Sequence, residues 1–338
     1  MNPAFQIRAR NAAFMRQRPT GESESADDGL FYLSSSIRRL YPAGVLFQKI
    51  TVAGVGLLGG SLGLAIRQRG LAGRVDGFVR RTASVAECEK LGVVDHATRD
   101  PRQAAEGADL IVLCTPIGQM REVLAQMLPT LKPSAIVTDV GSVKGSVVQE
   151  VESMVAQAGG HFIGSHPIAG AEKMGPGAAR ADLFVNAICV VTPTPKSAPD
   201  AVQRVEDFWK AIGARPLRLA PDVHDDLVSR SSHLPHVVAA GLVNSVLSST
   251  HPKEQEMVCA NGFRDTTRIA SGSPEMWRDI TLANRKYLAR ALSVFIDDLQ
   301  EFKLAIEAED RKAIEEFFER AKQRRDQWSG QTVSPSPE

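Results

Sequence analysis

The chain has 338 residues, which is too long for a single small domain and favours two domains of roughly 100–200 residues each. Hydrophobic residues make up 43% and charged residues 23%, a composition that excludes a chain disordered throughout. The 40 Lys and Arg residues balance 39 Asp and Glu residues, so no bulk positive charge is available to hold nucleic acid or an anionic membrane. No apolar run approaches the roughly 18 residues of a membrane-spanning helix. We therefore expect a small-molecule ligand, and neither nucleic acid nor a membrane, as the partner.

The two ends of the chain differ from the rest in composition. Residues 1–44 lack sustained hydrophobic periodicity and are predicted to be disordered or a non-native leader. Their arginine-rich start could mimic an organelle-targeting peptide, but the acidic cluster in residues 22–28 argues against that. Residues 329–338 are polar and proline-rich and should form a loose tail. We expect a variant that lacks residues 1–44 to remain active.

A glycine-rich turn follows the first strand-like segment, residues 50–53. It runs through Gly54, Gly56, Leu57, Leu58 and Gly59 and precedes an apolar helical stretch, which is the context that a GxGxxG motif needs. Gly54 should permit the tight turn, Gly56 the approach of a pyrophosphate, and Gly59 the packing of helix on strand. These five residues are predicted to bind a dinucleotide at the start of the helix. The alternative is a glycine-rich turn that holds no ligand.

Strand and helix signals alternate through residues 45–219. Strand-like runs occupy residues 75–79, 109–116, 135–140, 161–164 and 187–191. This alternation predicts an α/β domain of the Rossmann type, a doubly wound and mostly parallel sheet with helices on both faces. Ligands bind at the carboxyl ends of such strands. Thr115 and Pro116, the segment around Ser142, and the segment around His166 all follow strands, so we expect them to line one crevice.

The end of the second predicted strand bears on the choice of cofactor. In NAD-binding folds, an Asp or Glu about 20 residues beyond the glycines binds the ribose 2′-hydroxyl. Here Val79 takes that place, and Arg80 and Arg81 follow. Because a guanidinium suits a 2′-phosphate, the sequence favours NADP over NAD. The alternative is that both arginines are solvated residues at the entry of a helix.

The four cysteines stand far apart and none belongs to a CxxC pair; they are Cys88, Cys114, Cys189 and Cys259. Cys114 and Cys189 lie in apolar runs, where a buried and reduced thiol is the ordinary state. The pattern indicates neither a disulfide framework nor a structural zinc site, and no histidine pair has a further carboxylate arranged as a metal set. We therefore expect a cytoplasmic protein that holds no metal.

Residues 220–328 carry only helical signals. Helices are predicted over residues 221–247, 274–306 and 311–328. In the second of these, apolar residues recur at helical spacing and form a broad stripe; they are Leu288, Leu292, Phe295, Ile296 and Leu299. An all-α domain after a dinucleotide fold commonly forms a substrate wall and a dimer interface, so we expect a homodimer held by this domain.

Five segments resemble, in their order along the chain, the motifs of a known family. They are residues 54–61, 139–145 (DVGSVKG), 165–173 (SHPIAGAEK), 232–236 (SHLPH) and 263–270 (FRDTTRIA). With these segments, the chain resembles the prephenate/arogenate dehydrogenase family over residues 50–299. The resemblance implies oxidative decarboxylation of prephenate to 4-hydroxyphenylpyruvate and CO2, with hydride transfer to NAD(P)+, in tyrosine biosynthesis. The sequence does not decide between prephenate and arogenate, or whether tyrosine inhibits.

The resemblance assigns the catalytic roles to two residues. His166 matches the histidine that accepts a hydrogen bond from the substrate's C4 hydroxyl, and its place after a strand suits that role independently. The rate should then fall as His166 is protonated, near the ordinary pKa of about 6.5. The alternative is a structural histidine that caps the turn at Pro167. Ser142 matches the serine that orients this histidine and the nicotinamide, and it could also cap the following helix.

The resemblance assigns the substrate contacts to residues of the second half and one of the first. Arg268 matches the arginine that holds a substrate carboxylate, for which a bidentate guanidinium is well suited. His236 matches a histidine near the substrate side chain, with Ser232 in the same motif. Glu172 matches an acid that gates the site, and a salt bridge with Lys173 is its alternative. Trp277 matches an aromatic residue that reaches the partner subunit's site, and a core tryptophan is its alternative.

Two other kinds of protein stay open at this stage. One is another two-domain NAD(P)-dependent oxidoreductase, acting on a 3-hydroxy acid or an imine. The other is a non-catalytic dimer that senses the dinucleotide. The variant His166→Asn separates them from the family's reaction, because it should bind cofactor but lose turnover by about 10²–10⁴-fold.

Overall fold

The computed structural model describes residues 45–170 and 173–332. The predictions made for residues 1–44 and for Glu172 fall outside these ranges. The last helix, α14 (Arg311–Thr332), extends beyond the predicted end at residue 328 into the segment expected to be a loose tail. The rest of that predicted tail, residues 333–338, also lies outside the described ranges.

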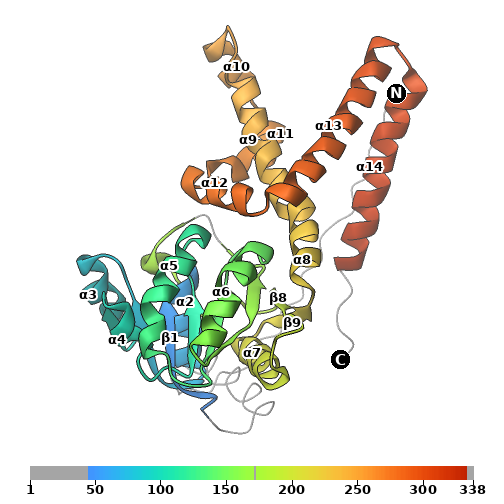
Figure 1. Cartoon of the computed structure of the whole chain (residues 1–338). Coiled ribbons are helices and arrows are strands. Elements are labelled where there is room, and N and C mark those ends of the chain that lie inside the picture. Colours follow the sequence, from blue (N-terminus) through green and yellow to red (C-terminus); the bar gives the residue numbers. More distant parts are fainter. Residues whose placement is uncertain (1–44, 171–172, 333–338) are drawn as a thin grey trace, which may run out of the picture. The chain divides into compact units, whose positions relative to one another are not determined.

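Six parallel strands form the main sheet in the order β3-β2-β1-β4-β5-β6. Their bounds are Phe47–Ala53 (β1), Ala72–Phe78 (β2), His96–Thr98 (β3), Leu110–Leu113 (β4), Ile136–Asp139 (β5) and His161–Phe162 (β6). Figure 1 shows β1 among the helices that cover this sheet. The order reverses between β1 and β4, which is the switch point where open α/β sheets bind ligands. The Rossmann-type sheet predicted from the sequence is therefore confirmed.

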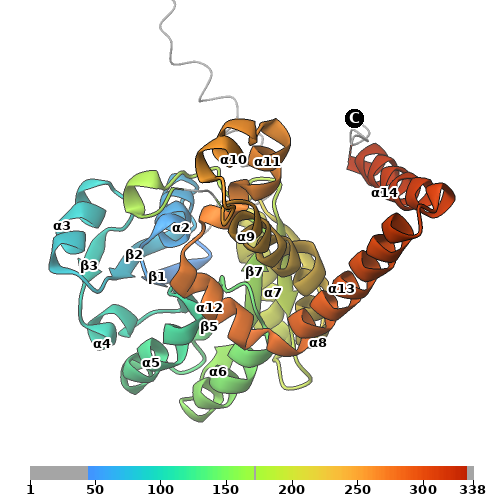
Figure 2. The ribbon, with the colours of Figure 1, turned by 90° about the horizontal axis from the view of Figure 1, so that it is seen from above.

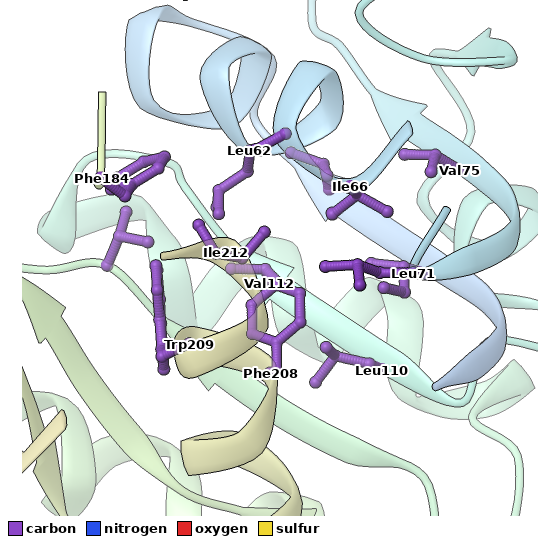
Figure 3. Packing of buried hydrophobic residues seen from close by; sticks show 14 of the residues in the cluster. Leu62, Ile66, Leu71, Val75, Leu110, Val112, Phe184, Phe208, Trp209 and Ile212 are labelled. Carbon is purple, nitrogen blue, oxygen red and sulfur yellow. The ribbon is translucent and has the colours of Figure 1, made fainter. Parts of the chain in front are cut away.

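Helices cover both faces of this sheet because the strands are apolar on both sides. The helices are α2 (Leu57–Gln68), α3 (Thr82–Lys90), α4 (Pro101–Ala105), α5 (Ile117–Met127), α6 (Gly145–Gln157) and α7 (Pro199–Ile212). Leu110 and Val112 of β4 belong to the core cluster with α2 and α7, which Figure 3 shows at close range. Ile111 and Leu113 face the other way, into the cluster with α5 and α6. Burial of each such side chain stabilises the fold by about 2 kcal/mol.

A second sheet of three strands follows, in the order β7-β8-β9. It consists of β7 (Gly164–Pro167), β8 (Ile188–Thr192) and β9 (Arg215–Arg218). Residues 187–191 form a strand as predicted, but β8 pairs antiparallel with β7 and lies outside the main sheet. A parallel return needs a crossover helix. Between β7 and β8, the described residues hold only a 3₁₀ turn, Pro176–Ala178, as regular structure, whereas α7 provides the crossover that makes β8 and β9 parallel.

The described residues after β9 are helical, as predicted. The helices are α8 (Pro221–Val228), α9 (Leu234–Val246), α10 (Pro252–Val258), α11 (Asn261–Thr267), α12 (Pro274–Ala283), α13 (Arg285–Glu307) and α14. The helix expected over residues 221–247 is interrupted by a π-helical turn, Ser229–His233. Pro235 explains the interruption, since its ring lacks an N–H and clashes with the carbonyl four residues earlier.

Two contacts define how the helical half is arranged. Helix α12 packs on α5 of the first half, where a Cβ added at Gly118 would lie 3.0 Å from Asp279 Oδ2 (Figure 2). Helices α13 and α14 pack together through Phe302 and Phe317, whose stacked rings have centroids 4.4 Å apart. None of the helices in the described part of the chain is long and apolar enough to cross a membrane.

Candidate active site

The glycine turn between β1 and α2 has the geometry that a dinucleotide requires. Gly54 has φ +102°, and a Cβ there would lie 2.9 Å from the backbone of Cys114. A Cβ at Gly59 would lie 2.1 Å from the Gly54 carbonyl oxygen. At Gly56, by contrast, no atom of the described residues lies within 4 Å of such a Cβ. The turn is therefore closely packed on its inner side and open at Gly56, where α2 begins and its free N–H groups face outward.

The neighbouring strand end offers polar atoms to the same crevice. Thr115 follows β4, and its buried Oγ1 has no hydrogen-bond partner among the described residues. Pro116 is the N-cap residue of α5. Leu57 and Leu58 pack against the hydrophobic core, so they can offer a ligand only their backbone groups. An open glycine, a helix N-terminus and a hydroxyl group without a partner fit a bound NAD(P).

Three arginines gather where β2 and β3 end. Arg80 and Arg81 precede α3 and are exposed, while Val79 is buried at 4% exposure and offers no polar group to a ribose. Arg99 follows β3, and its guanidinium donates to the Arg80 carbonyl oxygen (3.2 Å) and to Thr82 Oγ1 (3.1 Å). Arg99 was not among the residues predicted from the sequence. It could have been found by looking for cations directly after β3, the strand that pairs with β2.

His166 lies on β7, next to the carboxyl end of β5. The Nδ1 atom of His166 lies 2.8 Å from Nε2 of His224, and the two rings meet edge to face. Burial lowers the pKa of His166 well below 6.5, and His224 and Lys144 lower it further. The imidazole is therefore neutral at and well below neutral pH. The sequence-based expectation that His166 protonates near 6.5 is wrong, because it left out this burial.

A buried ion pair holds the strand that carries His166. The Lys144 ammonium pairs with the Asp139 carboxylate, and both side chains have 0% exposure. Lys144 Nζ also donates to the Ser165 carbonyl oxygen at 2.8 Å, and Asp139 Oδ1 accepts from the Ser165 backbone N–H at 3.0 Å. Since Ser165 precedes His166 directly, the pair fixes β7 to the end of β5.

Ser142 lies in the loop between β5 and α6. It does not cap α6, whose N-cap residue is Lys144. Among the described residues, the Ser142 hydroxyl makes no hydrogen bond to His166. The Ser142 backbone instead interacts with His233, which raises the pKa of that ring slightly against the stronger lowering by burial. The role in orienting His166 stays a prediction.

The carboxylate that serves the N-terminus of α6 comes from the other half of the chain. Asp225 of α8 accepts the backbone N–H of Lys144 at 2.7 Å and that of Gly145 at 2.8 Å. Asp225 Oδ1 also lies 2.8 Å from His224 Nδ1. The site predicted from the sequence did not include His224, which contacts His166, or Asp225. In the described residues no cluster of three or more His, Cys, Asp or Glu side chains forms a metal site.

His233 and Asn284 complete the buried polar layer. The Asn284 amide nitrogen lies 3.0 Å from His233 Nδ1 and donates to the Asp225 carbonyl oxygen at 2.9 Å. Burial lowers the pKa of His233 to about 4. His233 is thus a neutral core residue. Asn284 also separates α12 from α13, so the single helix predicted over residues 274–306 is in fact two helices.

The predicted substrate-binding residues Ser232, His236 and Trp277 lie together. His236 Nδ1 donates to the Ser232 carbonyl oxygen at 2.9 Å, so its Nε2 stays available. The Trp277 ring stacks on His236 with centroids 3.8 Å apart. Trp277 thus contacts two histidines of its own chain, the second being His233, whose ring meets it edge to face.

Arg268 begins the 3₁₀ turn Arg268–Ser271, which packs on α9, the helix of His236. Its side chain is exposed. The structure thus brings the turn of Arg268 against the helix that carries His236. The gate assigned to Glu172 lies outside the described residues.

A parallel sheet with an open glycine turn at its switch point, and a neutral histidine next to the carboxyl end of β5 in the same sheet, are the features of an oxidoreductase that uses a nicotinamide dinucleotide. Two family models match the chain. Prephenate dehydrogenase, nucleotide-binding domain, matches residues 62–217, and prephenate dehydrogenase, dimerization domain, matches residues 220–323. The chain therefore belongs to the prephenate dehydrogenase family, which confirms the resemblance seen in the sequence.

Individual relatives agree with the family models. Prephenate dehydrogenase of Bacillus subtilis is 34% identical over 283 residues, which are 82% of this chain and 75% of that protein. Cyclohexadienyl dehydrogenase of Zymomonas mobilis is 34% identical over 284 residues, 83% of this chain and 96% of that protein. Prephenate dehydrogenase from Aquifex aeolicus, solved with hydroxyphenyl propionate and NAD+, has a TM-score of 0.79 at 30% identity, covering 85% of this chain and 99% of that one. Arogenate dehydrogenase from Synechocystis has a TM-score of 0.70 at 30% identity, covering 83% and 99%.

Proposed function

We propose that this chain oxidises and decarboxylates prephenate, or its amino counterpart arogenate, with hydride transfer to NAD(P)+. The observation that carries the proposal is the neutral His166 imidazole next to the carboxyl end of β5, in the sheet that carries the glycine turn. A hydroxyl group that becomes a carbonyl group needs such a proton acceptor. The names of the relatives support the substrate class.

In this mechanism, His166 receives a proton and later returns it. The C4 hydroxyl of the substrate donates a hydrogen bond to the imidazole, which takes the proton as the C4–H bond breaks and hydride leaves. The ring carboxylate then leaves as CO2, and its bonding electron pair completes the aromatic ring, so that the C4 oxygen becomes a phenolate. The imidazolium protonates this oxygen and is neutral again. Bound NAD(P)+ supplies the hydride acceptor.

The substrate's two carboxylates would be held by residues of the helical half. His236 has a free Nε2 because Nδ1 donates to Ser232, and Trp277 fixes the plane of its ring by stacking. Arg268 can supply a guanidinium from the turn that packs on the same helix. We propose His236, Ser232, Trp277 and Arg268 as the substrate wall.

The assay of His166→Asn tests the proposed reaction. The wild type should form the nicotinamide product with prephenate or arogenate, and the variant should lose about 10²–10⁴-fold in kcat while calorimetry records unchanged NADP+ binding. His161→Gln is the matched control, because His161 begins β6 at the amino end of the sheet. A wild type that turns over neither substrate, or a variant with near-normal turnover, would contradict the proposal.

NADP is the cofactor that the three arginines favour over NAD. Arg80 and Arg81 stand beside Arg99, which is held against the Arg80 carbonyl. Arg80→Ala and Arg81→Ala should each raise the KM for NADP+ about tenfold or more and leave that for NAD+ unchanged. Lys90→Ala, an exposed cation at the other end of α3, should change neither. A wild type that strongly prefers NAD+ would argue against this cofactor.

A homodimer through the helical half follows from two observations. The region that matches the dimerization domain carries exposed apolar side chains on α13, among them Val294, Leu299 and Leu304. Light scattering should therefore give twice the chain mass of 36.5 kDa. Leu299→Asp should lower that mass, and a monomeric wild type would contradict the proposal.

The cytoplasm is the compartment we propose. All four cysteines are free, and burial raises the pKa of Cys88 to about 11, which keeps its thiol protonated and unreactive. Such thiols suit a reducing compartment. Cell fractionation tests this, and recovery of the protein outside the cytoplasm would contradict it.

A further inference from the structure

A row of hydrogen bonds connects the catalytic face of His166 to a carboxylate in the other half of the chain. His166 Nδ1 lies 2.8 Å from His224 Nε2, and His224 Nδ1 lies 2.8 Å from Asp225 Oδ1. The His224 side chain is fully buried, and Asp225 is 3% exposed. His224 can therefore exchange protons only with its two hydrogen-bond partners, His166 and Asp225.

Backbone donors fix the direction of every bond in this row. The backbone N–H groups of Lys144 and Gly145 each donate to one oxygen of Asp225, so both oxygens act as acceptors. The proton between Asp225 and His224 must then sit on His224 Nδ1. Because a neutral imidazole carries one proton, His224 Nε2 is an acceptor, and the proton of His166 sits on Nδ1.

We propose that His224 and Asp225 are positioning residues that hold His166 in the tautomer with a lone pair on Nε2. This inference rests on the proposed function, in which Nε2 must accept the proton of the substrate hydroxyl. In the opposite tautomer, Nε2 would carry a proton and the acceptor would point to His224 rather than to the substrate. The row therefore decides whether the imidazole can act as a base at all.

The same row distributes the positive charge that His166 acquires. When Nε2 takes the substrate proton, the proton on Nδ1 shifts toward His224 Nε2, and that on His224 Nδ1 shifts toward the Asp225 carboxylate. When the phenolate takes its proton back from Nε2, the shifts reverse, so no proton or electron is gained or lost. The Asp225 carboxylate favours a positive charge on this row, whereas Lys144 and His233, the other charged and titratable groups near His166, disfavour one by lowering the pKa of that ring.

Burial keeps both histidines neutral before the reaction. It lowers the pKa of His224, and the hydrogen bond that His224 donates to Asp225 only partly opposes that lowering. Each ring in the row thus carries a single proton, which is the condition for one defined tautomer.

The experiment compares His224→Leu, which removes the acceptor, with His224→Gln, whose amide oxygen can still accept from His166 Nδ1. His224→Leu should lower kcat by about 10²–10⁴-fold with little change in the KM for substrate or cofactor. His224→Gln should retain about tenfold more activity than His224→Leu. His161→Gln serves again as the control and should keep the wild-type kcat.

A second measurement does not depend on turnover. ¹⁵N NMR of histidine-labelled wild type, with His166→Asn to assign the signals, should find His166 protonated at Nδ1 and unprotonated at Nε2. A proton on Nε2 in the wild type, or a wild-type kcat in His224→Leu, would overturn the inference about the tautomer. If the wild type still turned over its substrate, the proposed reaction would be unaffected by that result. A wild type without turnover would instead reject the proposed function, and the NMR result would still decide the tautomer.

Discussion

The ion pair between Lys144 and Asp139 is buried, so the stability of the fold should be sensitive to the loss of the Lys144 side chain. Both side chains have 0% exposure, and Lys144 also donates to the Ser165 carbonyl oxygen at 2.8 Å. Burial lowers the pKa of Lys144, and the Asp139 carboxylate is the main group that opposes this. The variant Lys144→Met keeps a side chain of similar length but leaves the Asp139 carboxylate buried without its cation.

We expect Lys144→Met to lower the free energy of unfolding by about 3–5 kcal/mol, the usual cost of removing one partner from a buried ion pair. The Ser165 carbonyl, left without its donor, adds about 1 kcal/mol or more. In a chain of this size the sum corresponds to a fall in Tm of roughly 10 °C. Urea unfolding followed by circular dichroism measures it directly. The double variant with Asp139→Asn should recover part of the loss, since no buried charge then stays unpaired.

Lys303→Met provides the matched control, because it removes an exposed pair with Glu307 on α13. An exposed pair at this helical spacing contributes about 0.5 kcal/mol or less. Equal losses in Lys144→Met and Lys303→Met would refute the reasoning. A double variant no more stable than Lys144→Met would refute the part that concerns the unpaired charge.

Three further predictions follow from the geometry. Gly56→Ala should fold normally and bind NADP+ more weakly, whereas Gly59→Ala should be destabilised by its contact with the Gly54 carbonyl; calorimetry and thermal unfolding separate the two, and equal Tm values would contradict this. The unfolded chain takes up protons on histidine before buried His233 does, so His233 should contribute up to about 3 kcal/mol to a loss of stability as pH drops from 6.5 toward its pKa of about 4. His166 and His224, whose pKa values are also lowered, add to this loss, so His233→Gln should reduce the slope in urea titrations without abolishing it. Trp277→Ala should raise the substrate KM more than it lowers kcat, and an unchanged KM would remove the ring from the substrate wall.

Features that depend on local order were predictable from the sequence. The glycine turn can be recognised in the sequence because a strand, three glycines and a helix occur within one short segment. The parallel sheet followed from the alternation of elements, although the short edge strand β3 was not predicted, and the helical half followed from the loss of strand signals after residue 219. The role of His166 was assigned from the family's motif, and its place after a buried strand suits that role; it stays a prediction.

Features that depend on contacts between distant segments were not predictable. His166 and His224 are 58 positions apart, and only folding brings Nδ1 of one to Nε2 of the other. The depressed pKa of His166 has the same origin, because it reflects burial under the helical half rather than the residue type. The antiparallel pairing of β7 with β8 depended on a connection without a helix, for which the strand-like pattern of residues 187–191 gave no indication.

The two halves of the chain share one buried polar layer, and this links their packing to the chemistry. Asp225 of the helical half accepts the N–H groups at the start of α6, and Asn284 holds the Asp225 carbonyl from the other side. The tautomer of His166 therefore depends on contacts across the boundary between the halves. A loosening of that boundary would free His224 while the main sheet, with its own core on both faces, stays intact. Catalytic activity should accordingly be lost at lower urea concentrations than the circular dichroism of the sheet, and coincident transitions would show that the halves unfold as one unit.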